Sequence, residues 1–87
     1  MKQSPDFILR SIADSNVLVP VGAATKTFPG MVTMNATGVF LWRKLETEQT
    51  AQSLADALLA QYDCSAEQAK TDVDGFLKKL QEIGAIV

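Results

Sequence analysis

The chain has 87 residues, of which 47% are hydrophobic and 21% charged, and its formal net charge is −2. This length predicts a single domain over residues 1–87, and the composition excludes intrinsic disorder. The slight acidic excess excludes the basic surface that non-specific contact with nucleic-acid phosphates or anionic lipid requires. A domain this small buries a small share of its surface, so a homodimer that adds to its stability remains a possible state.

The charge is unevenly distributed along the chain. Residues 1–44 carry five bases and two acids, a net charge of +3, whereas residues 45–87 carry three bases and eight acids, a net charge of −5. The acidic second half is interpreted either as an ordinary solvated helix surface or as an electrostatic guide for a partner.

The chain contains a single cysteine. This residue is Cys64, and the sequence contains no histidine, so no intrachain disulfide is possible and a thiol nucleophile would lack an activating base. We interpret Cys64 as a loop or half-buried filler. The sequence shows neither a signal peptide nor an apolar run of membrane-spanning length, so we expect a cytoplasmic protein with no membrane contact.

The first predicted element is a β-hairpin. The segment before Phe7 is polar and contains a proline, so residues 1–6 are expected to fray. Alternation over Phe7–Ile12, turn residues at 13–16 and an apolar run over Val17–Val21 predict strand, turn and strand. Because Pro20 has no backbone N–H, we expect the second strand to lack a partner on that side.

A loop and a third strand follow the hairpin. Residues 22–30 hold two glycines, a proline and several small side chains, which predicts a surface loop. Met31–Met34 is predicted as the third strand of an antiparallel sheet, at an edge with unpaired N–H and C=O groups.

The first predicted helix begins after Asn35, whose side chain is a candidate N-cap, and ends near Glu46. Its apolar residues fall at helical spacing, with Arg43 and Lys44 turned toward water. Trp42 is the largest apolar side chain of the set, so we expect it to anchor the core.

Two more helices are predicted. Thr50 is a candidate N-cap for a helix that reaches about Gln61, and its buried stripe is predicted as Leu54, Leu58 and Tyr62. Ser65, with Gln68 three residues later, fits the capping-box pattern of a long third helix that Gly84 ends. The apolar face of this third helix is predicted to comprise Ala69, Val73, Phe76, Leu77, Leu80 and Ile83. The apolar residues 85–87 are expected to pack back against the sheet or the helices.

Three strands followed by three helices predict an α+β fold of winged helix-turn-helix type. No catalytic residue, cofactor or metal site is predicted, because the chain lacks histidine, a phosphate-binding glycine loop and clustered ligands. Asp72 and Asp74 lie two positions apart on a helix and point in different directions, so they do not form a carboxylate pair. DNA binding is the alternative function, and it is disfavoured because Lys70, Lys78 and Lys79 are the only cations of the last two helices.

A family resemblance begins at the third strand. An apolar strand ending in Met-Asn-x-Thr-Gly, followed by a short apolar run and Trp42, resembles the signature of the PqqD family, small proteins tied to pyrroloquinoline quinone (PQQ) synthesis and related peptide-modifying pathways. Upstream, residues 7–10 and 17–22 resemble the opening strand pair of that family. Downstream, the matching positions are Leu54, Leu58, Tyr62, Asp63, Asp72, Val73, Phe76, Leu77, Leu80 and Gly84. The resemblance covers nearly the whole chain.

The resemblance implies a non-catalytic peptide chaperone, a recognition element for ribosomally synthesised and post-translationally modified peptides (RiPPs). Such proteins bind the leader segment of a precursor peptide between the third strand and the third helix and present it to a radical S-adenosylmethionine (radical SAM) enzyme. Strand addition to an exposed sheet edge is the physical counterpart of this activity. The sequence leaves the precursor, its modification and the partner enzyme open.

The predicted peptide-binding residues follow from this mode of binding. The backbone edge would be offered by Met31, Val32, Thr33 and Met34. One border of the third helix would line the groove, and the helical period does not choose between the two borders. The first border comprises Lys70, Asp74, Leu77 and Gln81, and the opposite border comprises Asp72, Phe76 and Lys79.

Overall fold

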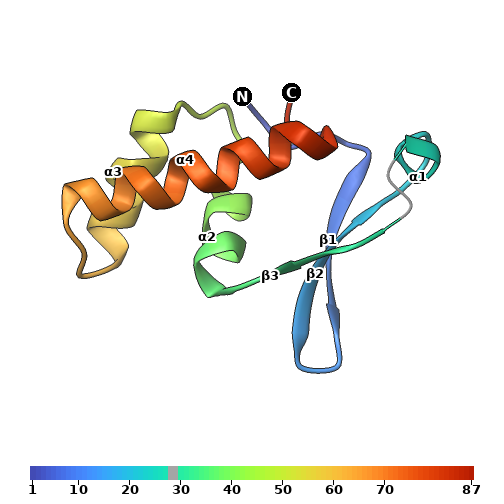
Figure 1. Ribbon diagram of the computed structural model, residues 1–87, viewed down its shortest axis with the longest axis horizontal. Coiled ribbons are helices and arrows are strands. Elements are labelled where there is room, and N and C mark those ends of the chain that lie inside the picture. The colour runs from blue at the N-terminus through green and yellow to red at the C-terminus, as the bar shows by residue number, and fades with distance from the viewer. Residues whose placement is uncertain (28–29) are drawn as a thin grey trace.

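The computed structural model describes residues 1–27 and 30–87. The sheet lies on one side of the molecule and the helices α3 and α4 on the other, with α2 between them (Figure 1). The elements are β1 (Phe7–Ile12), β2 (Ser15–Pro20), α1 (Ala24–Thr27), β3 (Val32–Met34), α2 (Ala36–Lys44), α3 (Ala51–Gln61) and α4 (Ala66–Ile83). The predicted α+β class, with a three-stranded antiparallel sheet followed by helices, is confirmed.

The β1–β2 hairpin has a shorter turn than the sequence predicted. Its strands pair from Phe7 with Pro20 to Ile12 with Ser15, so only two residues form the turn. Ala13 takes a positive φ of 54° there, as the first residue of a tight hairpin turn can. The prediction of a four-residue turn at 13–16 is therefore wrong, because alanine at positive φ carries no turn signal in sequence.

The hydrogen-bond alternation of the sheet follows from this turn. Ile12 and Ser15 flank a two-residue turn, so these two residues exchange backbone hydrogen bonds. Alternate residues of β2 then face β1, and the residues between them, including Asn16 and Leu18, face β3. Pro20 lies beyond the last β2 residue that pairs with β3, as its missing N–H predicted.

The loop after β2 contains one element that the sequence did not predict. Residues 24–27 form the short helix α1, where a loop was expected. Phe28 and Pro29 of that predicted loop lie outside the described residues.

Local capping signals fix the helix ends. The Asn35 side chain accepts a hydrogen bond from the Gly38 N–H at 2.8 Å, which confirms the predicted N-cap of α2. Thr50 caps α3 in the same way. Gly84 ends α4 in the left-handed conformation with φ 77°, where glycine avoids the steric strain of a Cβ atom.

The capping box predicted at the start of α4 is only half formed. Ser65 accepts a hydrogen bond from the Gln68 N–H at 3.0 Å. The Gln68 side chain does not return the bond, because its amide donates to the Asp72 carboxylate at 2.8 Å. The reciprocal box instead occurs at α3, between Thr50 and Ser53.

Trp42 is buried with 3% of its surface exposed, which confirms its predicted place in the core. The buried cluster joins the sheet to the helices through Phe7, Leu18, Ala24, Val32, Met34, Leu41, Trp42, Leu45, Leu54, Ala55, Leu58, Ala69, Val73, Leu77, Leu80 and Ala85. Tyr62 was predicted to be buried and is 37% exposed. It follows the last turn of α3 with extended backbone, so its side chain leaves the helical stripe and meets the Phe40 ring edge-on.

The two chain ends are paired with each other. Lys2 and Val87 exchange two backbone hydrogen bonds of 2.9 Å, and the Ser4 N–H donates to Ala85 O at 2.8 Å. Gln3 also bonds the backbone of Leu45. The prediction that residues 1–6 fray is therefore wrong, and the C-terminal residues pack against the N-terminal segment. No helix in the described part of the chain is long and apolar enough to cross a membrane.

Candidate functional site

One edge of the sheet is formed by β3, because the strand order is β1-β2-β3. Asn16 pairs with Met34 and Leu18 pairs with Val32. Since Asn16 and Leu18 direct their backbone groups toward β3, Val32 and Met34 direct theirs toward β2. The N–H and C=O of Thr33 therefore point to the open side of the strand.

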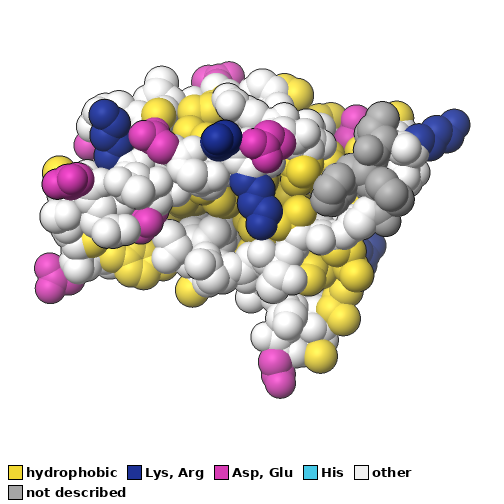
Figure 2. All heavy atoms as spheres, viewed as in Figure 1, with side chains coloured by type: hydrophobic (Ala, Val, Ile, Leu, Met, Phe, Trp, Pro, Cys, Tyr) yellow, Lys and Arg dark blue, Asp and Glu magenta, His cyan; other side chains and the backbone are white. Residues whose placement is uncertain are grey.

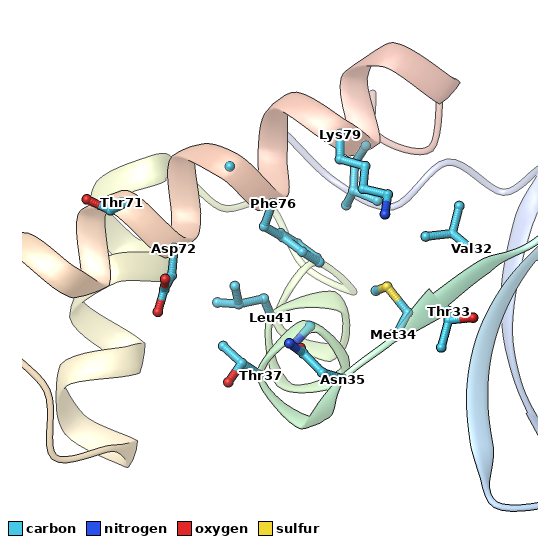
Figure 3. A pocket seen from close by; sticks show the side chains of 13 residues that line it. Val32, Thr33, Met34, Asn35, Thr37, Leu41, Thr71, Asp72, Phe76 and Lys79 are labelled. Carbon is cyan, nitrogen blue, oxygen red and sulfur yellow. The ribbon is translucent and has the colours of Figure 1, made fainter.

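A groove of ≈ 580 Å³ lies beside this edge. The whole of β3 contributes to it, and Figure 3 shows these side chains below α4. The N-cap Asn35 and the first two turns of α2 supply the floor, the helix with Thr37, Gly38 and Leu41. The strand therefore runs directly into a helix whose N-terminal end underlies the groove.

The opposite wall of the groove is one face of α4. This face contributes Thr71, Asp72, Gly75, Phe76, Lys79 and Leu80. Figure 3 shows the Phe76 ring pointing from α4 toward Met34 and Leu41. Phe76 is only half-buried, so its ring is available at the surface of the groove.

The structure distinguishes the two borders of α4 between which the sequence did not choose. Asp72, Phe76 and Lys79 line the groove together with Val32, Thr33 and Met34. None of the residues of the other border contributes to the groove, namely Lys70, Asp74, Leu77 and Gln81.

The reason is the way in which α4 packs. Leu77 is buried in the core cluster with 6% of its surface exposed. The other three residues of that border are exposed outside the groove, namely Lys70, Asp74 and Gln81. Met31 precedes β3, is 61% exposed, and is absent from the groove lining. The strand edge beside the groove is therefore Val32–Met34, one residue shorter than the predicted edge Met31–Met34.

The two ends of the groove carry opposite charges. Asp72 lies toward the Thr37 end and Lys79 toward the Val32 end (Figure 3). The Asp72 carboxylate already accepts a hydrogen bond from Gln68, whereas Lys79 forms no ion pair within the described part of the chain. An extended segment in the groove would therefore meet a free cation at one end only.

Sequence reasoning missed several groove residues. Thr71 gave no signal, Thr37 and Gly38 were recognised only as part of the Met-Asn-x-Thr-Gly motif, and Leu41 and Leu80 were predicted only as core. Gly75 did offer a signal, because glycine in a helix interior is unfavourable and calls for an explanation.

Other chemistry is sparse in the described residues. Cys64 is half-buried between α3 and α4, as predicted for a filler. Among the residues that the structure describes, no three side chains of His, Cys, Asp or Glu come together as metal ligands.

The fold and the groove define a class of protein: a winged-helix-like α+β module with an open strand edge beside a helix face. The sequence profile of the family Coenzyme PQQ synthesis protein D (PqqD) matches residues 16–86. The chain therefore belongs to the PqqD family, as the resemblance predicted. No curated protein matches the sequence significantly.

Two solved structures share the fold. TbiB1 in complex with the TbiA(beta) leader peptide superimposes with a TM-score of 0.76 at 24% identity, over 98% of this chain and 93% of that one. Lasso peptide synthetase B1 complexed with the leader peptide gives a TM-score of 0.74 at 17% identity, over 97% of this chain and 93% of that one. At these identities the two structures establish the shared fold.

Proposed function

We propose that this protein binds the leader segment of a ribosomally synthesised precursor peptide in the groove between β3 and α4. The peptide adds as a further strand beside β3, where the outward N–H and C=O of Thr33 supply main-chain hydrogen bonds. Its alternate side chains enter the groove. The observation that carries the proposal is the open edge of β3 next to a groove of ≈ 580 Å³.

The comparisons support this proposal in two ways. The chain belongs to the PqqD family, and the two solved structures with the same fold are complexes with leader peptides. The groove carries the functional proposal, because one fold serves many functions.

The proposal extends to the partners that the sequence analysis named. The protein acts without catalysis of its own, in the cytoplasm, and presents the bound peptide to a radical SAM enzyme. The acidic surface of residues 45–87 is free to guide that partner. A homodimer is compatible with this arrangement, because the second sheet edge, at β1, is not part of the groove.

Thr33→Pro tests the strand-addition step. Proline removes the outward N–H of Thr33 and leaves the hydrogen bonds between β2 and β3 in place, because an edge position tolerates proline. The variant is expected to keep its fold and to bind the peptide at least about tenfold more weakly, the equivalent of about 1.4 kcal/mol. Thr33→Ala is the matched control, because it shortens the same side chain and keeps the N–H.

The assay is isothermal titration with a synthetic leader segment, taken from a short precursor gene that is to be sought in the neighbourhood of this gene. Far-UV circular dichroism of both variants checks the fold. Equal affinity of Thr33→Pro and Thr33→Ala would show that the edge of β3 is not used.

Salt dependence separates peptide binding from the alternative, DNA binding. Main-chain and apolar contacts weaken little with salt, so affinity for the leader is expected to fall by less than about fivefold between 50 and 200 mM salt. A protein that neutralises six to ten phosphates loses about 10³–10⁵ in affinity over that range. Undetectable binding of the leader, with tight and strongly salt-dependent binding of upstream DNA, would overturn the proposal.

A further inference from the structure

Gly75 lies in the interior of α4, well away from both helix ends. Glycine there lowers helix stability relative to alanine, because it loses more conformational freedom on folding. A glycine at this position therefore needs a reason in the folded protein or in a complex.

The folded protein offers no such reason. Gly84 has a φ of +77°, and a Cβ atom on Gly38 would come within 3.3 Å of the Asn35 Oδ1. Gly75 has neither constraint, since its φ is not positive and a Cβ built on it meets no heavy atom of the described residues within 4 Å. An alanine would fit the free protein without any rearrangement.

Gly75 lies on the side of α4 that forms the wall of the groove, so its lack of a side chain changes the shape of that wall. Thr71 and Lys79 lie one turn before and after it on the same ridge, and all three residues line the groove. Four residues of α-helix span about 6 Å, so the ridge is interrupted over a length of about 12 Å. The absent side chain leaves a notch in the wall of the groove.

The surface beside this notch is apolar. Phe76 is the next residue of α4, and its half-buried ring points toward Met34 and Leu41 across the groove (Figure 3). Figure 2 shows apolar side chains exposed in the hollow below α4, with charged groups along the helix above them. A side chain that enters the notch therefore meets hydrocarbon on one side and bare helix backbone on the other.

We infer that the notch at Gly75 is a subsite for one large apolar side chain, leucine-sized or bigger, of the bound peptide. The inference rests on the proposed function. A strand added beside β3 would run about 4.8 Å from it and would turn alternate side chains to the same face. One of these side chains crosses the α4 ridge at Gly75 and packs against Phe76.

Two substitutions at Gly75 test the inference, because they act in opposite directions on stability and on binding. Gly75→Ala is expected to raise the midpoint of thermal unfolding by about 2–8 °C, as removal of an interior helix glycine does in a domain of this size. The same change is expected to weaken binding of the leader segment about three- to tenfold, and Gly75→Leu at least about thirtyfold. Lys78→Ala is the control, because Lys78 is exposed on the same helix and does not line the groove.

An alanine scan of the leader segment identifies the side chain that occupies the notch. One large apolar residue of the peptide is expected to lose at least about tenfold in affinity for the parent protein when it is changed to alanine. Against Gly75→Leu the same peptide change is expected to cost less than about threefold, because the notch is already filled.

Two results would overturn the inference, and they are distinguishable. If the leader binds the parent protein and Gly75→Leu equally well, the notch is not a subsite, while strand addition stands on the Thr33 variants. If the parent protein does not bind the leader at all, the proposed function fails, and the inference about the notch fails with it.

Discussion

Replacement of Trp42 by alanine tests whether the core joins the sheet to the helices as described. Trp42 is 3% exposed and belongs to the buried cluster that includes Phe7 of β1, with Leu9 packed against that cluster. Truncation of a buried large aromatic side chain costs about 3–5 kcal/mol. A chain of this length is stable by about 4–13 kcal/mol at 0.05–0.15 kcal/mol per residue, so the variant should lose a large share of its stability.

The thermal midpoint gives the same expectation in degrees. At about 4–8 °C per kcal/mol for a domain of this size, the loss corresponds to a fall of about 12–40 °C. Urea titration should be followed by far-UV circular dichroism, because Trp42 is the only tryptophan and its fluorescence is lost with the substitution.

Tyr62→Ala is the matched control for this experiment. Tyr62 is also aromatic, but it is 37% exposed and touches the Phe40 ring edge-on at 5.6 Å. We expect this change to cost about 1 kcal/mol, the usual contribution of an aromatic pair. A Trp42→Ala variant within about 0.5 kcal/mol of the parent protein, the range of ordinary surface changes, would refute the described core.

Two further predictions concern the end of α4 and the chain termini. Gly84→Ala should lower stability by about 1 kcal/mol in urea titration, because alanine at φ +77° is strained; a rise in stability would contradict the described C-cap. Deletion of residues 2–4 should cost about 2–4 kcal/mol, measured by thermal unfolding, because it removes backbone hydrogen bonds to Leu45 and residues 85–87. Lys2→Ala keeps those bonds and should stay within about 0.5 kcal/mol of the parent protein.

The parts of the fold that were predictable from sequence depend on neighbours in the chain. Asn35, Thr50 and Gly84 were recognised as caps because each acts on backbone groups within a few residues of itself. The buried face of α4 was recognised because burial repeats with the helical period.

The errors concern features that depend on distant residues. The N-terminal segment was expected to fray, but its order depends on Leu45 and Ala85, which lie far along the chain. The hairpin turn was predicted to be longer than it is. Strand register, and not the composition of the turn, decides where the pairing of β1 and β2 stops.

The candidate site shows the same limit. Both borders of α4 follow the same helical period, so Phe76 and Leu77 are equivalent in sequence until β3 is placed. The position of β3 depends on its pairing with β2, which joins Thr33 to Val17. Gly75 was not predicted as a site residue, although an interior helix glycine is conspicuous in the sequence itself.

The pairing of Lys2 with Val87 has a consequence for how this chain can be built into other proteins. The two ends emerge side by side (Figure 1) and are joined by a reciprocal pair of backbone hydrogen bonds. A host polypeptide can therefore leave and re-enter at almost one point, with linkers of only a few residues. The same geometry permits circular permutation, in which the order of the elements along the gene changes while the open strand edge at Thr33 keeps its place. A fusion at the N-terminus replaces the charged Met1 amine that contacts the Glu48 carboxylate, so a short linker there should preserve the rest of the terminal pairing.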